Sequence, residues 1–173
     1  MLLGAGMFAS TVFGTACKED PPKSSAEEPV VIGVSLGLTG DLGSFASTLR
    51  NAIRAAEGEI NSGGGVLGRQ VKFEIVDDRS DEKDFATSIA QDFANANVAA
   101  VLGPAGSGQV KTMQGIFAEK QIIQISPSAT STELTGIQPT GDRYLFRTTP
   151  ADDFQGAAVI LFATKTPAGI ADG

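Results

Sequence analysis

The sequence predicts an α/β fold, a doubly wound parallel sheet covered by helices in a three-layer sandwich. From residue 30 onward, apolar runs of strand length alternate with segments whose apolar residues recur at helical spacing. Parallel strands joined by helices require right-handed crossovers, which place helices on both faces of the sheet. At 173 residues, the chain is long enough for about one domain with a hydrophobic core.

The first half of this region contains two predicted strands and two predicted helices. The mostly apolar run 30–38 is typical of a buried parallel strand. Ser44 is expected to cap a helix that ends at the glycines of 63–65, where a left-handed backbone is favourable. Residues 71–75 alternate as a second strand, and Asp81 is expected to cap the second helix.

The second half continues the alternation with three further strands. Apolar runs predict strands at 98–102, 122–125 and 143–147. A third helix is expected from three apolar residues at helical spacing, namely Val110, Met113 and Phe117. A last helix is expected from Asp152 to about residue 163, whereas 164–173 show no periodicity and add no strand.

Composition argues against several classes of protein. The net charge is −7 and the 13 Lys and Arg are scattered, so we expect no nucleic-acid partner. The chain has no histidine, which removes the usual general base, the Ser-His-Asp triad and imidazole metal ligands. Carboxylates or lysine still allow chemistry, so an enzyme is disfavoured rather than excluded. We predict a protein without catalytic residues, metal site or cofactor.

The N-terminal segment has the composition of an export signal followed by a tether. Residues 1–16 are apolar or small, and they are fewer than the roughly 20 that a membrane-spanning helix needs. They lack the basic residues that usually begin a signal, so the signal is expected to be incomplete. Residues 17–29 are charged and contain prolines, which predicts a flexible tether.

The single cysteine, Cys17, follows the small residues of 14–16, as the lipidated cysteine does in the lipobox of bacterial lipoproteins. Gly14 stands where that motif usually has Leu or Val. We predict that Cys17 is a lipidation site. The alternative is a misassigned start codon and a buried free thiol.

Two turns at predicted strand ends hold the candidate binding residues. The third strand ends in GPAGSG at 103–108, and the fourth ends in SPSAT at 126–130. In an open parallel sheet, ligands bind at the carboxyl ends of the strands. These turns offer hydroxyls and backbone N–H groups but no titratable side chain, which suits a small anion such as a carboxylate. Ser107 is expected at a helix start, as a plain N-cap or as a ligand contact.

Neither turn fits a catalytic motif. A dinucleotide-binding fingerprint needs G-x-G-x-x-G after the first strand, whereas these glycines lie at 103, 106 and 108 after the third. A nucleophile elbow needs G-x-S-x-G, but Ala105 occupies the first glycine position and no histidine exists to activate Ser107.

A cluster of acidic residues near the second helix raises the question of a cation site. Its members are Asp77, Asp78, Asp81, Glu82 and Asp84. Their spacing fits no EF-hand loop. Acidic residues at a helix start ordinarily complement the helix dipole, and we favour this structural interpretation.

Six motifs follow one another in a specific order: GLTGDLG at 37–43, INSGGGVLGR at 60–69, VDDRSD at 76–81, VLGPAGSG at 101–108, ISPSATSTELT at 125–135 and YLFRTTPADDFQG at 144–156. Together they closely resemble the leucine/isoleucine/valine-binding protein family, the type I periplasmic solute-binding receptors of ABC transporters. The family fold has two α/β lobes joined by hinge strands, which close on an amino acid or related molecule. By this resemblance, 30–148 is the N-terminal ligand-binding lobe, and 149–173 is the hinge and the truncated start of the second lobe.

The resemblance also implies ligand-binding residues. Ser107 matches the serine that hydrogen-bonds the α-carboxylate of the ligand, and Ser128 matches a position whose backbone group contacts it. Thr130 matches a threonine that binds through its hydroxyl and N–H. Phe45 lies where the family often places an aromatic ring against the ligand, although a phenylalanine at a helix start is as often a core residue.

The function implied is that of a lipid-anchored, extracytoplasmic solute-binding protein in the periplasm or cell envelope. It takes a branched-chain amino acid or similar small carboxylate and feeds an ABC permease. Alternatives are a sensory or regulatory ligand-binding domain on the same fold and, more remotely, a flavodoxin-like or dinucleotide-binding enzyme domain. Because family members are roughly twice as long, we expect a truncated chain that lacks the second-lobe contacts to the ligand's ammonium group and side chain.

Overall fold

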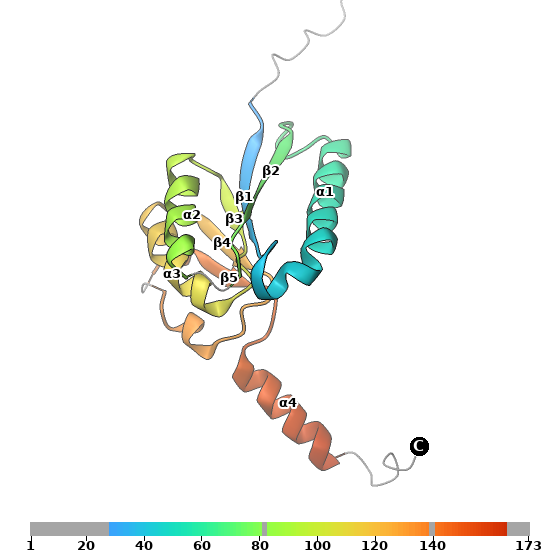
Figure 1. Ribbon diagram of the computed structural model, residues 1–173, viewed down its shortest axis with the longest axis vertical. Coiled ribbons are helices and arrows are strands. Elements are labelled where there is room, and N and C mark those ends of the chain that lie inside the picture. The colour runs from blue at the N-terminus through green and yellow to red at the C-terminus, as the bar shows by residue number, and fades with distance from the viewer. Residues whose placement is uncertain (1–27, 81–82, 139–140, 166–173) are drawn as a thin grey trace, which may run out of the picture.

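The computed structural model describes residues 28–80, 83–138 and 141–165, which form a parallel sheet flanked by helices (Figure 1). The strands are β1 (Val30–Leu36), β2 (Val71–Asp77), β3 (Ala100–Leu102), β4 (Ile123–Ser126) and β5 (Leu145–Arg147). The helices are α1 (Ala46–Ser62), α2 (Lys83–Asn95), α3 (Ser107–Glu119) and α4 (Asp152–Lys165), with short 3-10 helices η1 (Gly40–Phe45) and η2 (Thr132–Thr135). Neighbouring strands pair in parallel in the order β2-β1-β3-β4-β5. The predicted fold class is confirmed.

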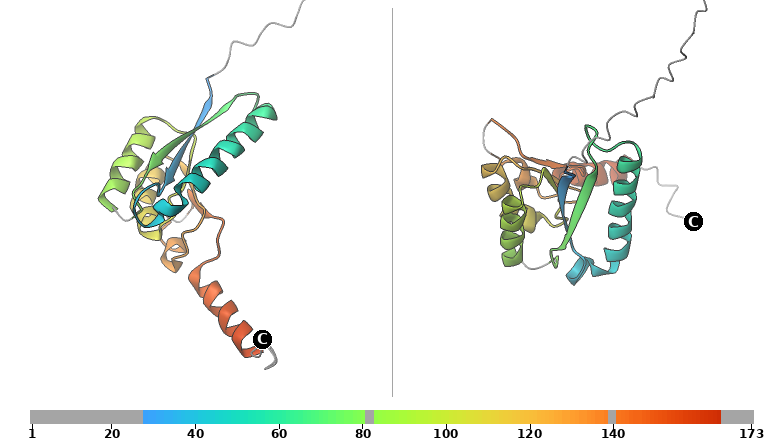
Figure 2. Two further views of the ribbon diagram at one scale, coloured as in Figure 1. Left: turned by 45° about the vertical axis from the view of Figure 1, so that its right-hand side comes forward. Right: turned by 90° about the horizontal axis from the view of Figure 1, so that it is seen from above.

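The strand order reverses at β1, as a doubly wound sheet requires. The chain runs from β1 to β2 on one side and then crosses back to β3 on the other side of β1. As a result, α1 covers one face of the sheet, and α2 and α3 cover the other (Figure 2). In such sheets, ligands bind beyond the carboxyl ends of the strands, where the order reverses.

The larger hydrophobic core lies between the sheet and helices α2 and α3. Met113 and Phe117 of α3, predicted from their spacing, are completely buried there. Phe93 of α2 packs so closely on Gly33 of β1 that a Cβ at residue 33 would lie 2.9 Å from the phenyl ring. Glycine at this position therefore allows α2 to approach the sheet.

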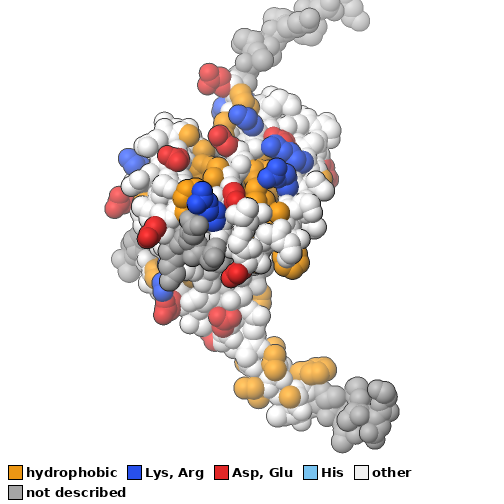
Figure 3. All heavy atoms as spheres, viewed as in Figure 1, with side chains coloured by type: hydrophobic (Ala, Val, Ile, Leu, Met, Phe, Trp, Pro, Cys, Tyr) orange, Lys and Arg blue, Asp and Glu red, His pale blue; other side chains and the backbone are white. Residues whose placement is uncertain are grey.

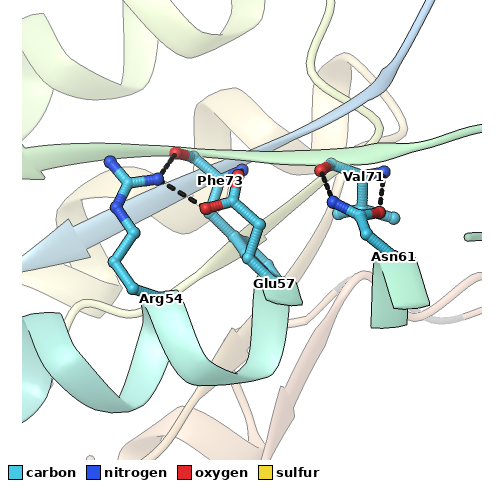
Figure 4. Close-up of polar contacts among 5 residues, drawn as sticks. All are labelled: Arg54, Glu57, Asn61, Val71 and Phe73. Carbon is cyan, nitrogen blue, oxygen red and sulfur yellow. Dashed lines mark hydrogen bonds and ion pairs between the residues drawn. The ribbon is translucent and has the colours of Figure 1, made fainter. Parts of the chain in front are cut away.

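The opposite face is covered by α1, whose apolar stripe packs on β1 and β2 through Leu49, Ile53, Ala56 and Ile60. Polar side chains of α1 also bond β2, an edge strand of the sheet (Figure 4). Asn61 accepts a hydrogen bond from the Val71 N–H at 2.7 Å and donates to the Val71 carbonyl at 2.8 Å. Glu57 accepts from the Phe73 N–H at 3.0 Å. Because β2 has a strand neighbour on one side only, α1 supplies partners for its outward-facing backbone.

The start of α1 differs from the prediction. The expected cap by Ser44 is wrong, because Ser44 lies inside η1 and α1 begins at Ala46 without a side-chain cap. The cause is a contact distant in sequence. The Ser80 hydroxyl donates to the Thr39 carbonyl at 2.8 Å and accepts from the Leu42 N–H at 3.2 Å. These bonds hold the chain before α1 in the η1 turn.

Other element bounds are close to those predicted. β3 is shorter than expected because the Val98 N–H bonds to the Phe93 carbonyl and so continues the end of α2. α4 begins at Asp152 as predicted. The expected cap Asp81, the export signal and Cys17 lie outside the described residues.

α4 projects from the sheet and its flanking helices (Figure 1). All its residues are exposed, and five are large and apolar: Phe154, Val159, Ile160, Leu161 and Phe162. The space-filling view shows hydrophobic side chains along the projecting helix (Figure 3). Within the described ranges, no helix is both long and apolar enough to span a bilayer.

Candidate functional site

The two turns singled out in the sequence meet at the carboxyl ends of β3 and β4, which are neighbours in the sheet. The Ser126 hydroxyl donates to the Pro104 carbonyl at 2.6 Å, and the Ser128 hydroxyl donates to the Ala105 carbonyl at 3.2 Å. Side chains of the second turn thus bond the backbone of the first. The structure brings the two turns together as a single edge of the sheet.

Ser107 is the first residue of α3, and its hydroxyl links the two turns. The cap position is Gly106, and no side chain caps this helix. The alternative of Ser107 as a plain N-cap is therefore wrong. Its Oγ accepts from the Ser131 N–H at 3.2 Å, which leaves the hydroxyl hydrogen available to donate. The first intrahelical bond of α3 comes from the Val110 N–H, so the preceding N–H groups of the first turn have no helical acceptor.

Around Thr130, the neighbouring backbone groups are already paired. Its carbonyl accepts from the Asp152 N–H at 2.9 Å, and the carbonyls of Ala129 and Ser131 accept from Arg147. The N–H groups of Ala129 and Ser131 each donate to a serine hydroxyl at 3.2 Å. Within the described part of the chain, neither the N–H nor the hydroxyl of Thr130 has a hydrogen-bond partner. Two donors of this turn are left available to a ligand.

The other two predicted residues, Ser128 and Phe45, present different groups to a ligand. Ser128 is exposed and donates its hydroxyl to Ala105, so its side chain ties the turns and its backbone remains for a ligand. Phe45 ends η1, which follows β1 at the same edge of the sheet, and is 58% exposed. The alternative of Phe45 as a core residue is therefore wrong. Its contact with a ligand stays a prediction, as do those of the other three residues.

Asp77, the last residue of β2, anchors Leu38 and Thr39, which lead into η1, and sequence reasoning missed this role. Asp77 accepts from the N–H groups of Leu38, Thr39 and Arg79 and from the Thr39 hydroxyl, at 2.7–3.1 Å. Burial raises the pKa of Asp77, but these hydrogen bonds outweigh it and hold the pKa below its usual value of 3.8. The predicted role of complementing a helix dipole is thus replaced, for Asp77, by bonding of a loop.

Asp78 has a comparable structural role. It is buried and accepts from the Ser35 hydroxyl at 2.8 Å and from the Ser80 N–H at 3.0 Å. Its carbonyl accepts from the buried amide of Gln109 in α3 at 3.0 Å. Among the described residues, no group of three or more His, Cys, Asp or Glu side chains is placed to hold a metal ion.

A cavity of about 180 Å³ lies beside β5 and η2 rather than at the free donors. Its lining includes Thr135, Gln138, Arg143 and Arg147, and it sits behind the turn that carries Thr130. The donors of Thr130 and Ser107 are absent from its walls. We therefore place the candidate site at the turns, where unpaired donors gather, and not in this cavity.

Comparison with known proteins identifies the family of the chain. A family model described as periplasmic binding protein matches residues 29–170. The chain belongs to the periplasmic binding protein family.

Two curated members of this family show how much of a relative the chain represents. Leu/Ile/Val-binding protein homolog 1 of Brucella abortus is 34% identical over 84% of the chain and 42% of its own length. Leu/Ile/Val-binding protein BraC3 of Rhizobium johnstonii is 29% identical over 81% of the chain and 37% of its own length. The chain spans about two fifths of these curated relatives.

Solved structures of this family share the fold. The branched-chain amino acid transporter substrate-binding protein LivJ of Streptococcus pneumoniae, in complex with isoleucine, has a TM-score of 0.71 and 29% identity. That match covers 80% of the chain and 39% of LivJ. An ABC transporter substrate-binding protein of Desulfitobacterium hafniense, in complex with leucine, has a TM-score of 0.67. This match covers 80% of the chain and 40% of the Desulfitobacterium protein.

Proposed function

We propose that the chain is the N-terminal lobe of an extracytoplasmic solute-binding protein that takes a branched-chain amino acid or a similar small carboxylate. The observation that carries the proposal is the set of unpaired donors at the meeting turns: the N–H and hydroxyl of Thr130, and the hydroxyl hydrogen of Ser107. Donors at a helix start favour an anion through their unpaired N–H groups and the helix dipole. The named ligands of LivJ and its relatives support an amino acid as the source of that anion.

The proposed mechanism contains no bond chemistry. The carboxylate accepts hydrogen bonds from Ser107 and Thr130, and the backbone at Ser128 adds a further contact. The exposed ring of Phe45 offers apolar surface at the same edge. In the whole protein, closure of a second lobe buries the ligand, excludes water and presents the closed form to an ABC permease.

A sensory or regulatory domain on the same fold is the second candidate. The solved relatives named as substrate-binding proteins of transporters favour transport over sensing. A nucleotide-binding enzyme domain is less supported, because the turns lack both a fingerprint and a titratable group. Flavin or nicotinamide nucleotide binding at micromolar concentration would favour that enzyme class instead.

Lipid anchoring through Cys17 belongs to the same proposal. Radiolabelled palmitate should enter the wild-type protein expressed in bacteria, and Cys17→Ala should abolish the label. Equal labelling of the Cys17→Ala variant would contradict lipidation at this residue while leaving the ligand site untouched.

The binding proposal is tested by titrating the 173-residue chain with L-valine and following amide resonances by NMR. Each hydrogen bond to the carboxylate contributes about 0.5–1.5 kcal/mol, and somewhat more when charged. Three or four such bonds, offset by lost translational freedom, give an affinity of roughly millimolar or weaker for one lobe. We expect the amide resonances of Ser107 and Thr130 to shift and to saturate at millimolar L-valine or above. Calorimetry at micromolar protein should detect no heat of binding.

Variants decide whether the site is correct. Ser107→Ala and Thr130→Ala should each weaken valine binding several-fold, because each removes one donor to the carboxylate. Matched controls are Ser88→Ala on α2 and Thr48→Ala on α1, both on exposed surface. A micromolar dissociation constant that neither Ser107→Ala nor Thr130→Ala changes would contradict two claims: the weak affinity expected of a single lobe and the assignment of these residues to the site.

A further inference from the structure

We infer that Arg147 is a positioning residue for the candidate ligand site, because its guanidinium fixes the turn that presents the free donors of Thr130. The inference rests on the proposed function and extends it to a residue behind the site. Arg147 is the last residue of β5 and is partly buried. Sequence reasoning gave it no role.

The contacts of Arg147 bracket Thr130. Its Nη1 donates to the carbonyl of Ala129 at 3.4 Å and to that of Ser131 at 2.9 Å. Its Nη2 donates to the hydroxyl of Thr135 in η2 at 2.7 Å. One guanidinium therefore holds the residue on each side of Thr130 and also Thr135, the last residue of η2.

The hydrogen bond from Arg147 to the Ala129 carbonyl also fixes the direction of the Thr130 N–H. The Ala129 carbonyl and the Thr130 N–H belong to one planar, trans peptide, so they point in opposite directions. Because the carbonyl is directed at Arg147, the N–H of Thr130 points away from it. The next peptide is fixed separately, since its carbonyl accepts from Asp152 and its N–H donates to Ser107. Arg147 therefore controls the peptide that carries the unpaired N–H.

The choice of arginine follows from these contacts. Its planar guanidinium presents several N–H donors in a fixed arrangement, whereas a lysine ammonium is a compact point charge on a flexible stem. Its positive charge also sits at the carbonyl end of the peptide, which polarises the opposite N–H toward an anion. Lysine at this position keeps the charge but cannot span both carbonyls and Thr135 together.

The experiment compares wild type, Arg147→Met, Arg147→Lys and the control Arg143→Met by ¹⁵N NMR of the 173-residue chain. Arg143 is a suitable control because it lines the same cavity as Arg147 and is exposed. Without ligand, backbone order parameters at 129–131 should be typical of rigid backbone, about 0.85, in wild type and in the control. They should fall below about 0.6 in Arg147→Met, while the amides of β4 stay ordered.

The titration with L-valine gives the second readout. Arg147→Met should weaken binding at least fivefold, Arg147→Lys should recover only part of that loss, and Arg143→Met should match wild type. Unchanged order parameters in Arg147→Met would overturn the inference, and so would full recovery by lysine. If Arg147→Met fails to fold, Arg147→Lys decides by the same two measurements.

The failure of the proposed function is a distinct result. If wild type shows no valine-induced shift, the proposed ligand class is wrong for this chain. The order parameters of the ligand-free variants then still decide whether Arg147 holds the turn.

Discussion

Helices α3 and α4 are nearly equal in length, with 13 and 14 residues, but they differ in what their apolar residues contact. Three apolar residues of α3, Val110, Met113 and Phe117, are completely buried, and Ile116 is partly buried against the core. The apolar residues of α4 are distributed around the whole helix, and all are exposed. The pattern of α3 is typical of a helix packed on one side, and α3 is packed in this way. The pattern of α4 is typical of a buried helix, yet α4 is exposed.

The difference shows where the stability of each helix originates. A helix that is apolar on all sides is normally buried on all sides, and an exposed patch of this kind is typical of surfaces that contact further protein. α3 is stabilised by tertiary packing. α4 depends on its own backbone bonds, and an isolated helix of this length is marginal in water.

The largest expected effect is in amide hydrogen exchange. Amides of α3 should open only with global unfolding, whereas those of α4 should exchange through local fraying. For a domain with a typical stability of 5–15 kcal/mol, this predicts protection at least about 1,000-fold greater in α3. Exchange followed by NMR or mass spectrometry measures it. Comparable protection in the two helices would show that α4 is packed in solution.

A pair of phenylalanine substitutions tests the same contrast by stability. Phe117 is 0% exposed and Phe154 is 71% exposed. Phe117→Ala should lower the free energy of unfolding by about 3–5 kcal/mol, because it removes buried surface and leaves a cavity. Phe154→Ala should change it by less than about 0.5 kcal/mol. Urea denaturation followed by circular dichroism measures both, and a loss above 1 kcal/mol for Phe154→Ala would contradict the exposed position of α4.

The smallest effect concerns pH and should leave α4 unchanged. Because hydrogen bonds hold the pKa of folded Asp77 below 3.8, the ionised carboxylate stabilises the fold above that value. This stabilisation should be lost as the pH falls through the folded pKa. Asp77→Asn should cost about 1–2 kcal/mol at pH 7 through weakened bonds to Leu38 and Thr39. It should also reduce the loss of stability that wild type shows as the pH falls toward 2.

Urea midpoints between pH 2 and 7 check this prediction, with Asp41→Asn as a control on the exposed surface of η1. If the urea midpoint falls equally steeply at low pH in wild type and in Asp77→Asn, the pH dependence of stability comes from other carboxylates. Loss of α4 helicity in step with Asp77 protonation would show that the two regions are coupled.

The sequence was sufficient for the fold class because each strand and helix carries its own periodicity. It also located the turns at 103–108 and 126–130, since their composition and position after a strand are local properties. It was not sufficient for Ser44, whose capping role is replaced by bonds to Ser80. The roles of Asp77 and Arg147 depend on contacts between segments far apart in the chain, and no local pattern records such contacts. Phe45 shows the same limit, since its exposure is set by tertiary structure.

The polar side chains of α1 along β2 have a consequence for the behaviour of the protein in a crowded solution. An outermost strand with free backbone donors and acceptors is a template on which another extended chain can form a sheet. Asn61 already bonds the N–H and carbonyl of Val71, Glu57 bonds the N–H of Phe73, and Arg54 bonds the carbonyl of Phe73. A foreign strand that approaches this side must first break those bonds and displace α1. Helix α1 therefore also protects the β2 edge of the sheet from pairing with a foreign strand.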